Sequence, residues 1–123
     1  FIVWMVLVTF FCLATFPEVD DAGIDIPYLD KAAHFVFYAV AGFLGCFFLG
    51  ERSRGRLSLK AVLVTVVGFL VIYGIIIEVL QWGLTTTRSA EIADALANSL
   101  GALSGAAAVK FLFSRNWQLK WKN

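Results

Sequence analysis

Charged side chains are scarce in this chain of 123 residues, at 15% of the total, whereas soluble domains carry about a quarter. Hydrophobic residues make up 60%, and the mean hydropathy is +0.82. A chain this short and this poor in polar residues cannot coat a water-soluble globule, which excludes an ordinary soluble domain. The composition instead predicts one integral membrane domain over residues 1–123.

Cysteines are also few, and the net charge is close to zero. Cys12 and Cys46 are the only cysteines, and they fall toward opposite ends of the expected helices, so we expect no disulfide between them. The net charge of +1 carries no information about partners. For a membrane domain we expect membrane lipids as the surrounding medium and no nucleic-acid partner.

Long hydrophobic runs are what the sequence has in abundance. Four of them cover about residues 1–16, 30–50, 60–82 and 89–114. A membrane span needs about 20 residues, and the last three runs reach that length. The first is short and starts at Phe1 without an initiator methionine, which leaves open whether residues precede it. Because isolated strands cannot satisfy their backbone in lipid, we predict an all-α polytopic membrane protein with four transmembrane helices in an antiparallel bundle.

The loops divide the charges by sign. Eight of the ten basic residues fall on one side of the predicted bundle: Arg52, Arg54, Arg56, Lys60, Lys110, Arg115, Lys120 and Lys122. Eight of the nine acidic residues fall on the other: Glu18, Asp20, Asp21, Asp25, Asp30, Glu78, Glu91 and Asp94. The positive-inside rule assigns the basic side to the cytoplasm. We therefore predict a multi-pass protein of the cell membrane with both termini cytoplasmic.

Polar residues within the runs share one level, toward the acidic side, and one face of each helix. Their spacing of three or four residues aligns them. The stripes are Asp30, His34, Tyr38, Ala41 and Gly45 on the second run, Gly74, Glu78, Gln81 and Thr85 on the third, and Glu91, Asp94, Asn98, Gly101, Gly105 and Ala108 on the fourth. Small residues follow the polar ones on two stripes, and small residues allow close helix approach in lipid. We expect a tightly packed inner half and an outer half that surrounds a polar pocket.

Charges in such a pocket need partners, because an ionised side chain at mid-membrane costs about 2.5–3.5 kcal/mol. Arg88 can bind a carboxylate through two hydrogen bonds, and Lys31 and His34 can add positive charge. We therefore predict a hydrogen-bonded cluster of these groups with Glu78 and Asp94.

The order of these motifs resembles the VanZ-like family of small membrane proteins, which is associated with resistance to glycopeptide antibiotics such as teicoplanin. The family pattern is D-K-x-x-H-F-x-x-Y, then E-x-x-Q, then an arginine followed by D-x-x-x-N-x-x-G. It falls here on Asp30, Lys31, His34, Phe35, Tyr38, Glu78, Gln81, Arg88, Asp94, Asn98 and Gly101. The resemblance covers roughly residues 28–108 and departs from the pattern at Thr85-Thr86-Thr87, where a turn with proline or glycine is expected. It implies a role at the cell surface in glycopeptide susceptibility.

One hypothesis for the pocket is an enzyme that acts on a lipid-linked or cell-wall-related substrate. His34 would be the general acid or base beside Glu78 and Asp94. The ligand-binding residues would be Asp30, Lys31, Tyr38, Gln81, Arg88 and Asn98. No serine or cysteine lies in a nucleophile motif, so a covalent intermediate has no support. His34, Glu78 and Asp94 offer one nitrogen and two oxygen ligands to a metal, but without metal-motif spacing, and the cofactor stays unassigned.

A second hypothesis is binding without chemistry, in which the same cluster holds a lipid headgroup, a lipid-linked cell-wall precursor or a lipoglycopeptide. A third, an ion or proton pathway, needs polar residues through the inner half, where the last three helices offer only glycines, Ser104 and Thr65. Purely structural roles stay open as well: an interfacial His34, a helix end at Glu78 and Gln81, a headgroup anchor at Arg88, and interhelical contacts at Asp94 and Asn98.

Overall fold

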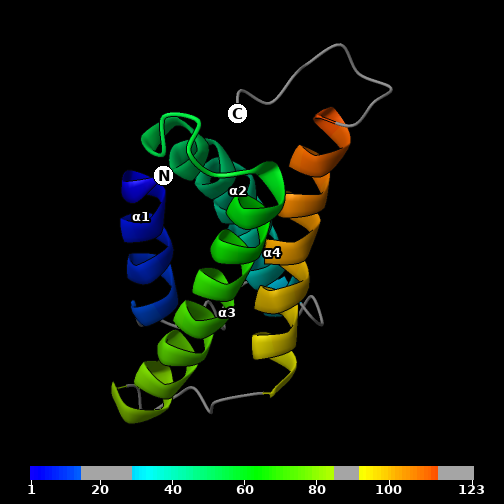
Figure 1. The fold of residues 1–123 in the computed structure, drawn as a ribbon. Coiled ribbons are helices and arrows are strands. Elements are labelled where there is room, and N and C mark those ends of the chain that lie inside the picture. The colour runs from blue at the N-terminus through cyan, green and yellow to red at the C-terminus, as the bar shows by residue number, and fades with distance from the viewer. Residues whose placement is uncertain (15–28, 85–91, 114–123) are drawn as a thin grey trace.

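The computed structural model describes residues 1–14, 29–84 and 92–113, and within them the regular structure is entirely helical. The helices are α1 (Ile2–Leu13), α2 (Leu29–Arg52), α3 (Leu59–Leu84) and α4 (Ile92–Leu112). They run alternately down and up, with α1 and α3 opposed to α2 and α4 (Figure 1). The predicted all-α antiparallel bundle is confirmed.

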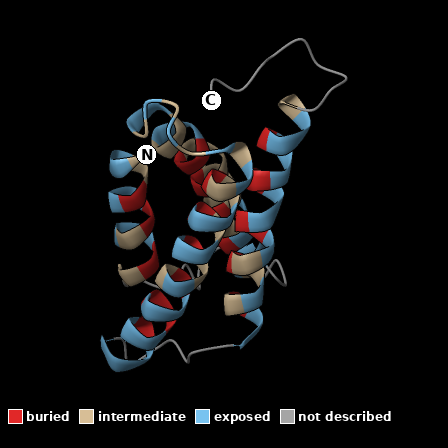
Figure 2. Cartoon of the chain, viewed as in Figure 1, coloured by how far each residue is buried: buried red, intermediate tan, exposed pale blue. Residues whose placement is uncertain are grey.

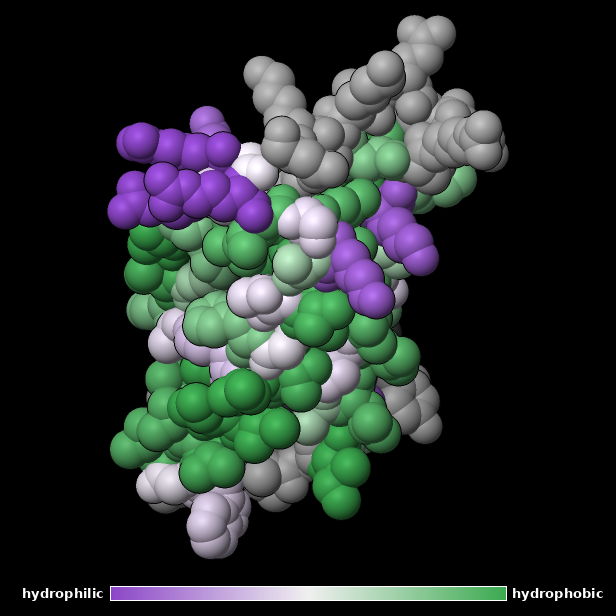
Figure 3. Space-filling view, viewed as in Figure 1, coloured by the Kyte–Doolittle hydropathy of each residue, from purple (hydrophilic) through white to green (hydrophobic). Residues whose placement is uncertain are grey.

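Three of the four helices, α2, α3 and α4, are long and apolar enough to cross a membrane. Their lipid-facing sides carry exposed hydrophobic residues such as Ile72, Val79 and Leu100. Figure 3 shows hydrophobic side chains over most of the drawn flank, with strongly hydrophilic ones toward the end that holds the α2–α3 loop. By contrast α1 has 12 residues, about 18 Å of helix. It ends at Leu13, three residues before the predicted end at residue 16.

The ends of α2 and α3 follow from local signals in the loop between them. Arg54 and Gly55 adopt left-handed backbone conformations, with φ of 51° and 78°, and a glycine at such a position stops a helix at little steric cost. Ser58 then caps α3, because its Oγ accepts a hydrogen bond from the Ala61 N–H at 3.3 Å.

Helices α2 and α4 form the closest pair, and small residues make that approach possible. A Cβ added at Gly42 would lie 2.6 Å from the Ala102 carbonyl oxygen, and one at Gly101 or Gly105 would collide with the Phe35 or Ala39 carbonyl. Four residues after Gly105, Val109 is buried, whereas Ala108 is exposed. The predicted α4 stripe is therefore wrong at Ala108: from Gly101 onward, the contact advances in steps of four residues.

The buried residues form one column between the helices, and they are red in Figure 2. The apolar part includes Val8, Val62, Leu70 and Ile77. Cys12 and Cys46 are both buried and both free, as expected. At the end of the bundle away from the α2–α3 loop, the column changes from apolar to polar.

Candidate functional site

The polar part of the core is a hydrogen-bonded group from three helices, His34 on α2, Glu78 on α3 and Asn98 on α4. His34 Nδ1 lies 3.0 Å from Asn98 Oδ1. Asn98 Nδ2 donates to Glu78 Oε1 at 3.3 Å. We call these three residues the His34 cluster. Asn98 holds its centre, because its side-chain amide joins the imidazole to the carboxylate.

The hydrogen bonds fix the direction of the imidazole ring. Because Asn98 gives an amide hydrogen to Glu78, its Oδ1 faces His34 and can only accept, so Nδ1 of His34 carries the hydrogen. Glu78 Oε1 also lies 3.7 Å from the same Nδ1. The other ring nitrogen, Nε2, lies 3.8 Å from Asp30 Oδ1. Nε2 is therefore the ring position through which His34 can gain or lose a proton.

Burial sets this group apart from ordinary interfacial polar residues. The exposed fraction is 3% for His34, 6% for Glu78 and 0% for Asn98. Polar groups removed from water are costly unless they have hydrogen-bond partners, and here each of the three makes a contact with another. Two members of the predicted cluster, His34 and Glu78, are thus in contact about one to two turns inside the end of the bundle.

A second pair lies nearer the end of the bundle. Lys31 Nζ is 3.3 Å from Asp94 Oδ1, with Asp94 buried and the Lys31 side chain 29% exposed. The Asp30 side chain is about half exposed. Asp94 Oδ1 has no hydrogen bond of good geometry among the described residues, so the contact with Lys31 is an ion pair rather than an aligned hydrogen bond. Charge therefore continues from the buried cluster toward the surface.

Tyr38 and Gln81 lie beside the cluster, in different surroundings. Tyr38 is fully buried, and a Cβ added at Gly74 would lie 3.3 Å from its ring. Its hydroxyl has no hydrogen-bond partner among the described residues. Gln81 Nε2 donates to the Cys12 carbonyl at 2.7 Å. Gln81 thus satisfies a carbonyl in the last turn of α1, a contact that the sequence did not predict.

Comparison with known families places these residues in context. The VanZ/LLP1 family model matches residues 1–113. The chain belongs to the VanZ/LLP1 family. The resemblance drawn from the sequence motifs is confirmed. Neither curated proteins nor solved structures give a match to the chain.

In this VanZ/LLP1 protein the three motifs of the sequence meet in space. The contacts above join residues of all three motifs: Asp30, Lys31 and His34 from the first, Glu78 from the second, and Asp94 and Asn98 from the third. Arg88 lies outside the described residues, as do Thr85, Ser89 and Glu91. The catalytic and ligand-binding roles of the nine named residues stay predictions, and so does the pocket around them.

The metal alternative also stays a prediction. Across residues 1–14, 29–84 and 92–113, no three His, Cys, Asp or Glu side chains are grouped closely enough to hold a metal ion. His34 and Glu78 approach one another, but Asp94 is paired with Lys31 instead.

Sequence reasoning missed the contacts that attach α1 to the bundle. Trp4 Nε1 donates to the Phe37 carbonyl at 2.9 Å, and the Thr9 hydroxyl bonds to that of Tyr73. The available signal was weak: Trp4 and Thr9 are the only residues of α1 with a hydrogen-bonding side chain other than Cys12. Polar side chains in a short apolar helix need partners, and these two could have been assigned to the neighbouring helices on that ground.

Proposed function

We propose that this VanZ/LLP1 protein lies in the cell membrane with the His34 cluster toward the non-cytoplasmic face. There it binds or acts on a lipid-linked or other cell-envelope ligand and so influences susceptibility to glycopeptide antibiotics of the teicoplanin type. The observation that carries the proposal is the convergence of His34, Glu78 and Asn98 from three helices into one buried contact group. A membrane protein retains such costly groups mainly where they serve a function.

The separation of charges supports this orientation. The α2–α3 loop holds Arg52, Arg54 and Arg56, and the N-terminus of α1 and the C-terminal end of α4 lie at the same end of the bundle (Figure 1). The positive-inside rule places this end in the cytoplasm. The His34 cluster lies toward the opposite end, which by the same rule would face the outside of the cell.

The ring geometry favours a proton-transfer role for His34. A histidine whose Nδ1 is held by a hydrogen-bonded partner presents Nε2 in a fixed direction, which is the arrangement a general base or acid requires. The half-exposed Asp30 stands next to Nε2. Lys31, which lies 3.3 Å from Asp94, would hold a phosphate or carboxylate of the substrate together with Arg88.

Binding without chemistry is a second candidate, and one observation favours it. The exposed fraction of His34 is only 3%, whereas Asp30 and Lys31 are more open. A ligand that meets only the open side chains would be bound by charge, and the buried cluster would then hold α2, α3 and α4 in position beneath it.

The two candidates separate in one experiment, in which a glycopeptide-sensitive bacterial host expresses wild-type protein or a variant and growth inhibition by teicoplanin is measured. His34→Gln keeps hydrogen-bonding capacity but cannot carry a proton. Ser104→Ala, on the exposed side of α4, is the matched control. We expect wild type and the control to shift the inhibitory concentration equally, and His34→Gln to abolish the shift.

Quantification of each variant in membranes guards against loss of the protein. If His34→Gln retains the shift and Arg88→Ala loses it, the binding candidate is correct. If both variants behave as wild type, the cluster has no part in the effect. A wild-type protein that leaves teicoplanin inhibition unchanged would contradict the antibiotic role itself.

A further inference from the structure

The α2–α3 loop, at the other end of the bundle, has a defined shape. The Ser53 N–H donates to the Leu49 carbonyl at 2.9 Å and its Oγ donates to the Gly50 carbonyl at 2.8 Å, which continues the end of α2. The left-handed turn at Arg54 and Gly55 follows. These local bonds hold the arginines of the loop on a fixed backbone.

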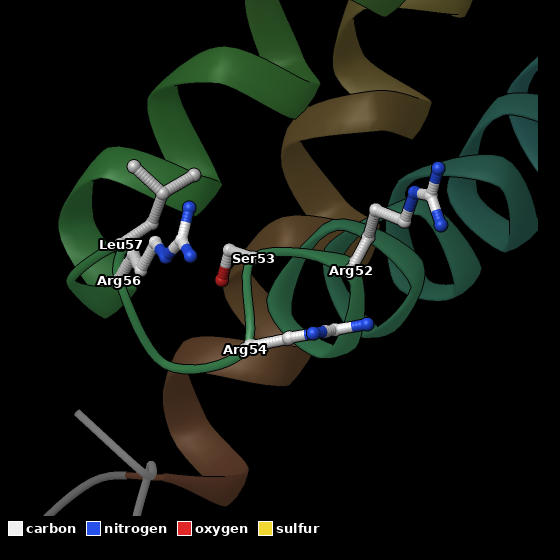
Figure 4. Close-up of a pocket in the computed structure, with 5 residues that line it drawn as sticks. All are labelled: Arg52, Ser53, Arg54, Arg56 and Leu57. Atoms are coloured by element: carbon white, nitrogen blue, oxygen red, sulfur yellow. The ribbon is translucent and has the colours of Figure 1, made fainter.

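An open hollow of about 500 Å³ lies at this loop, lined by Arg52, Ser53, Arg54, Arg56 and Leu57 (Figure 4). Three of its five lining residues are arginines, and Figure 4 shows the Arg52 and Arg54 side chains extending to the same side of the loop. A smaller hollow of about 270 Å³ shares Arg52 and Arg54 and is otherwise lined by Phe48 and Glu51.

The positive charge of the hollow is uncompensated within the described part of the chain. The ion pairs among the described residues involve Lys31 and His34, at the other end of the bundle. None of them joins Arg52, Arg54 or Arg56 to a carboxylate, although Glu51 lies in the same loop region. Three guanidinium groups around one concave surface attract an anion. Their planar forks match a phosphate, to which each can donate two hydrogen bonds.

We propose that this hollow binds the phosphate of an anionic membrane lipid. The choice of a lipid rests on Phe48, which precedes Arg52 by one helical turn on the same face of α2, lines the smaller hollow and is 40% exposed. A lipid seated here places its phosphate among the arginines and its acyl chains along Phe48 and the apolar flank below. Juxtamembrane basic groups favour anionic lipids in this way. The site is independent of the function proposed for the His34 cluster.

The test uses the full chain, purified in a neutral detergent, and measures bound dioleoyl-phosphatidylglycerol and dioleoyl-phosphatidylcholine by native mass spectrometry. We expect wild type to prefer phosphatidylglycerol. The triple variant Arg52→Gln/Arg54→Gln/Arg56→Gln should bind it about a hundredfold more weakly, because each basic group near a membrane surface contributes about fivefold. The control Lys60→Gln/Lys110→Gln removes two charges that do not line the hollow and should weaken binding much less than the triple variant does.

A second variant keeps the charge and the membrane orientation signal but removes the planar forks. Arg52→Lys/Arg54→Lys/Arg56→Lys should bind phosphatidylglycerol more weakly than wild type and more strongly than the glutamine variant. If the lysine variant and wild type bind the lipid equally, positive charge alone explains the binding and the shape of the hollow has no part in it. Equal binding of the two lipids, or an unchanged glutamine variant, would overturn the site.

Inorganic phosphate distinguishes the two sources of the anion. Added in excess, it should leave bound phosphatidylglycerol in place, because the lipid also contacts Phe48 and the apolar flank. Full displacement of the lipid by inorganic phosphate would overturn the lipid assignment in favour of a free anion. None of these readouts depends on His34, so this proposal and the teicoplanin proposal can fail separately.

Discussion

The two ends of the bundle treat charge in opposite ways. At one end His34, Glu78 and Asp94 are buried and each contacts a partner on another helix. At the other, Arg52, Arg54 and Arg56 are exposed and, within the described residues, have no carboxylate partner. Desolvation explains the difference: a group removed from water needs a partner inside the protein, whereas an exposed guanidinium is already solvated.

This contrast separates two kinds of site. A buried paired cluster is held in one geometry, which suits a group that must present a single atom, here Nε2 of His34, in a fixed direction. An exposed unpaired cluster keeps its charge available to a ligand from outside. The first should be sensitive to small structural changes and the second should not, and three predictions on stability test that difference.

The largest effect is expected at Gly101, where α4 approaches α2 next to the cluster. A Cβ there would collide with the carbonyl of Phe35, the neighbour of His34. Gly101→Val should therefore force α4 away from α2 and destabilise the bundle by about 3 kcal/mol, measured as unfolding in mixed detergent micelles by circular dichroism. At Gly68 an added Cβ meets nothing within 4 Å, so Gly68→Val is the matched control and should change stability by less than about 0.5 kcal/mol. Equal losses at the two glycines would contradict the close approach.

A smaller loss is expected from Asn98→Ala, which removes the amide between His34 and Glu78. Both groups then stay buried without their bridging partner, at a cost of about 2 kcal/mol in the same unfolding assay. The control is Ser99→Ala on the next residue, whose hydroxyl donates to the Ala95 carbonyl of its own helix. We expect a change below about 0.5 kcal/mol for the control. If Asn98→Ala were equally mild, the contacts of Asn98 would be incidental to stability.

The fold was largely predictable because the length of each hydrophobic run indicates whether it can form a membrane-spanning helix. The predicted helices 30–50, 60–82 and 89–114 correspond to Leu29–Arg52, Leu59–Leu84 and Ile92–Leu112. The end of α2 differs from the prediction by two residues and the start of α3 by one, since the Arg54–Gly55 turn and the Ser58 cap are local features that hydrophobicity does not mark. α1 was overestimated, because an apolar run gives no sign of where the helix stops within it.

The cluster was predictable in membership but not in detail. Spacing by three and four residues put His34, Glu78, Asp94 and Asn98 on facing stripes. It did not indicate that Asn98 would lie between His34 and Glu78, or that Asp94 would pair with Lys31, because side-chain partners depend on helix rotation and crossing. Ala106, Ala107 and Ala108 are equally small, so composition alone did not distinguish the buried Ala106 from the exposed Ala108. The ligand-binding role of Gln81 stays a prediction, and the sequence did not indicate that its amide would donate to the Cys12 carbonyl.

The smallest effect concerns the Lys31–Asp94 pair, which lies between the two extremes of burial. Because the Lys31 side chain is 29% exposed, water screens its attraction to Asp94, and a double-mutant cycle of Lys31→Gln and Asp94→Asn should give a coupling of about 1 kcal/mol or less. The matched cycle at the basic end uses Glu51→Gln and Arg54→Gln, residues three apart that form no ion pair in the described structure, and should give no measurable coupling. A coupling at Glu51 and Arg54 as large as that at Lys31 and Asp94 would mean that Glu51 neutralises the charge of Arg54. The contrast between the two ends of the bundle would then disappear, and so would the free positive charge assigned to the arginine hollow.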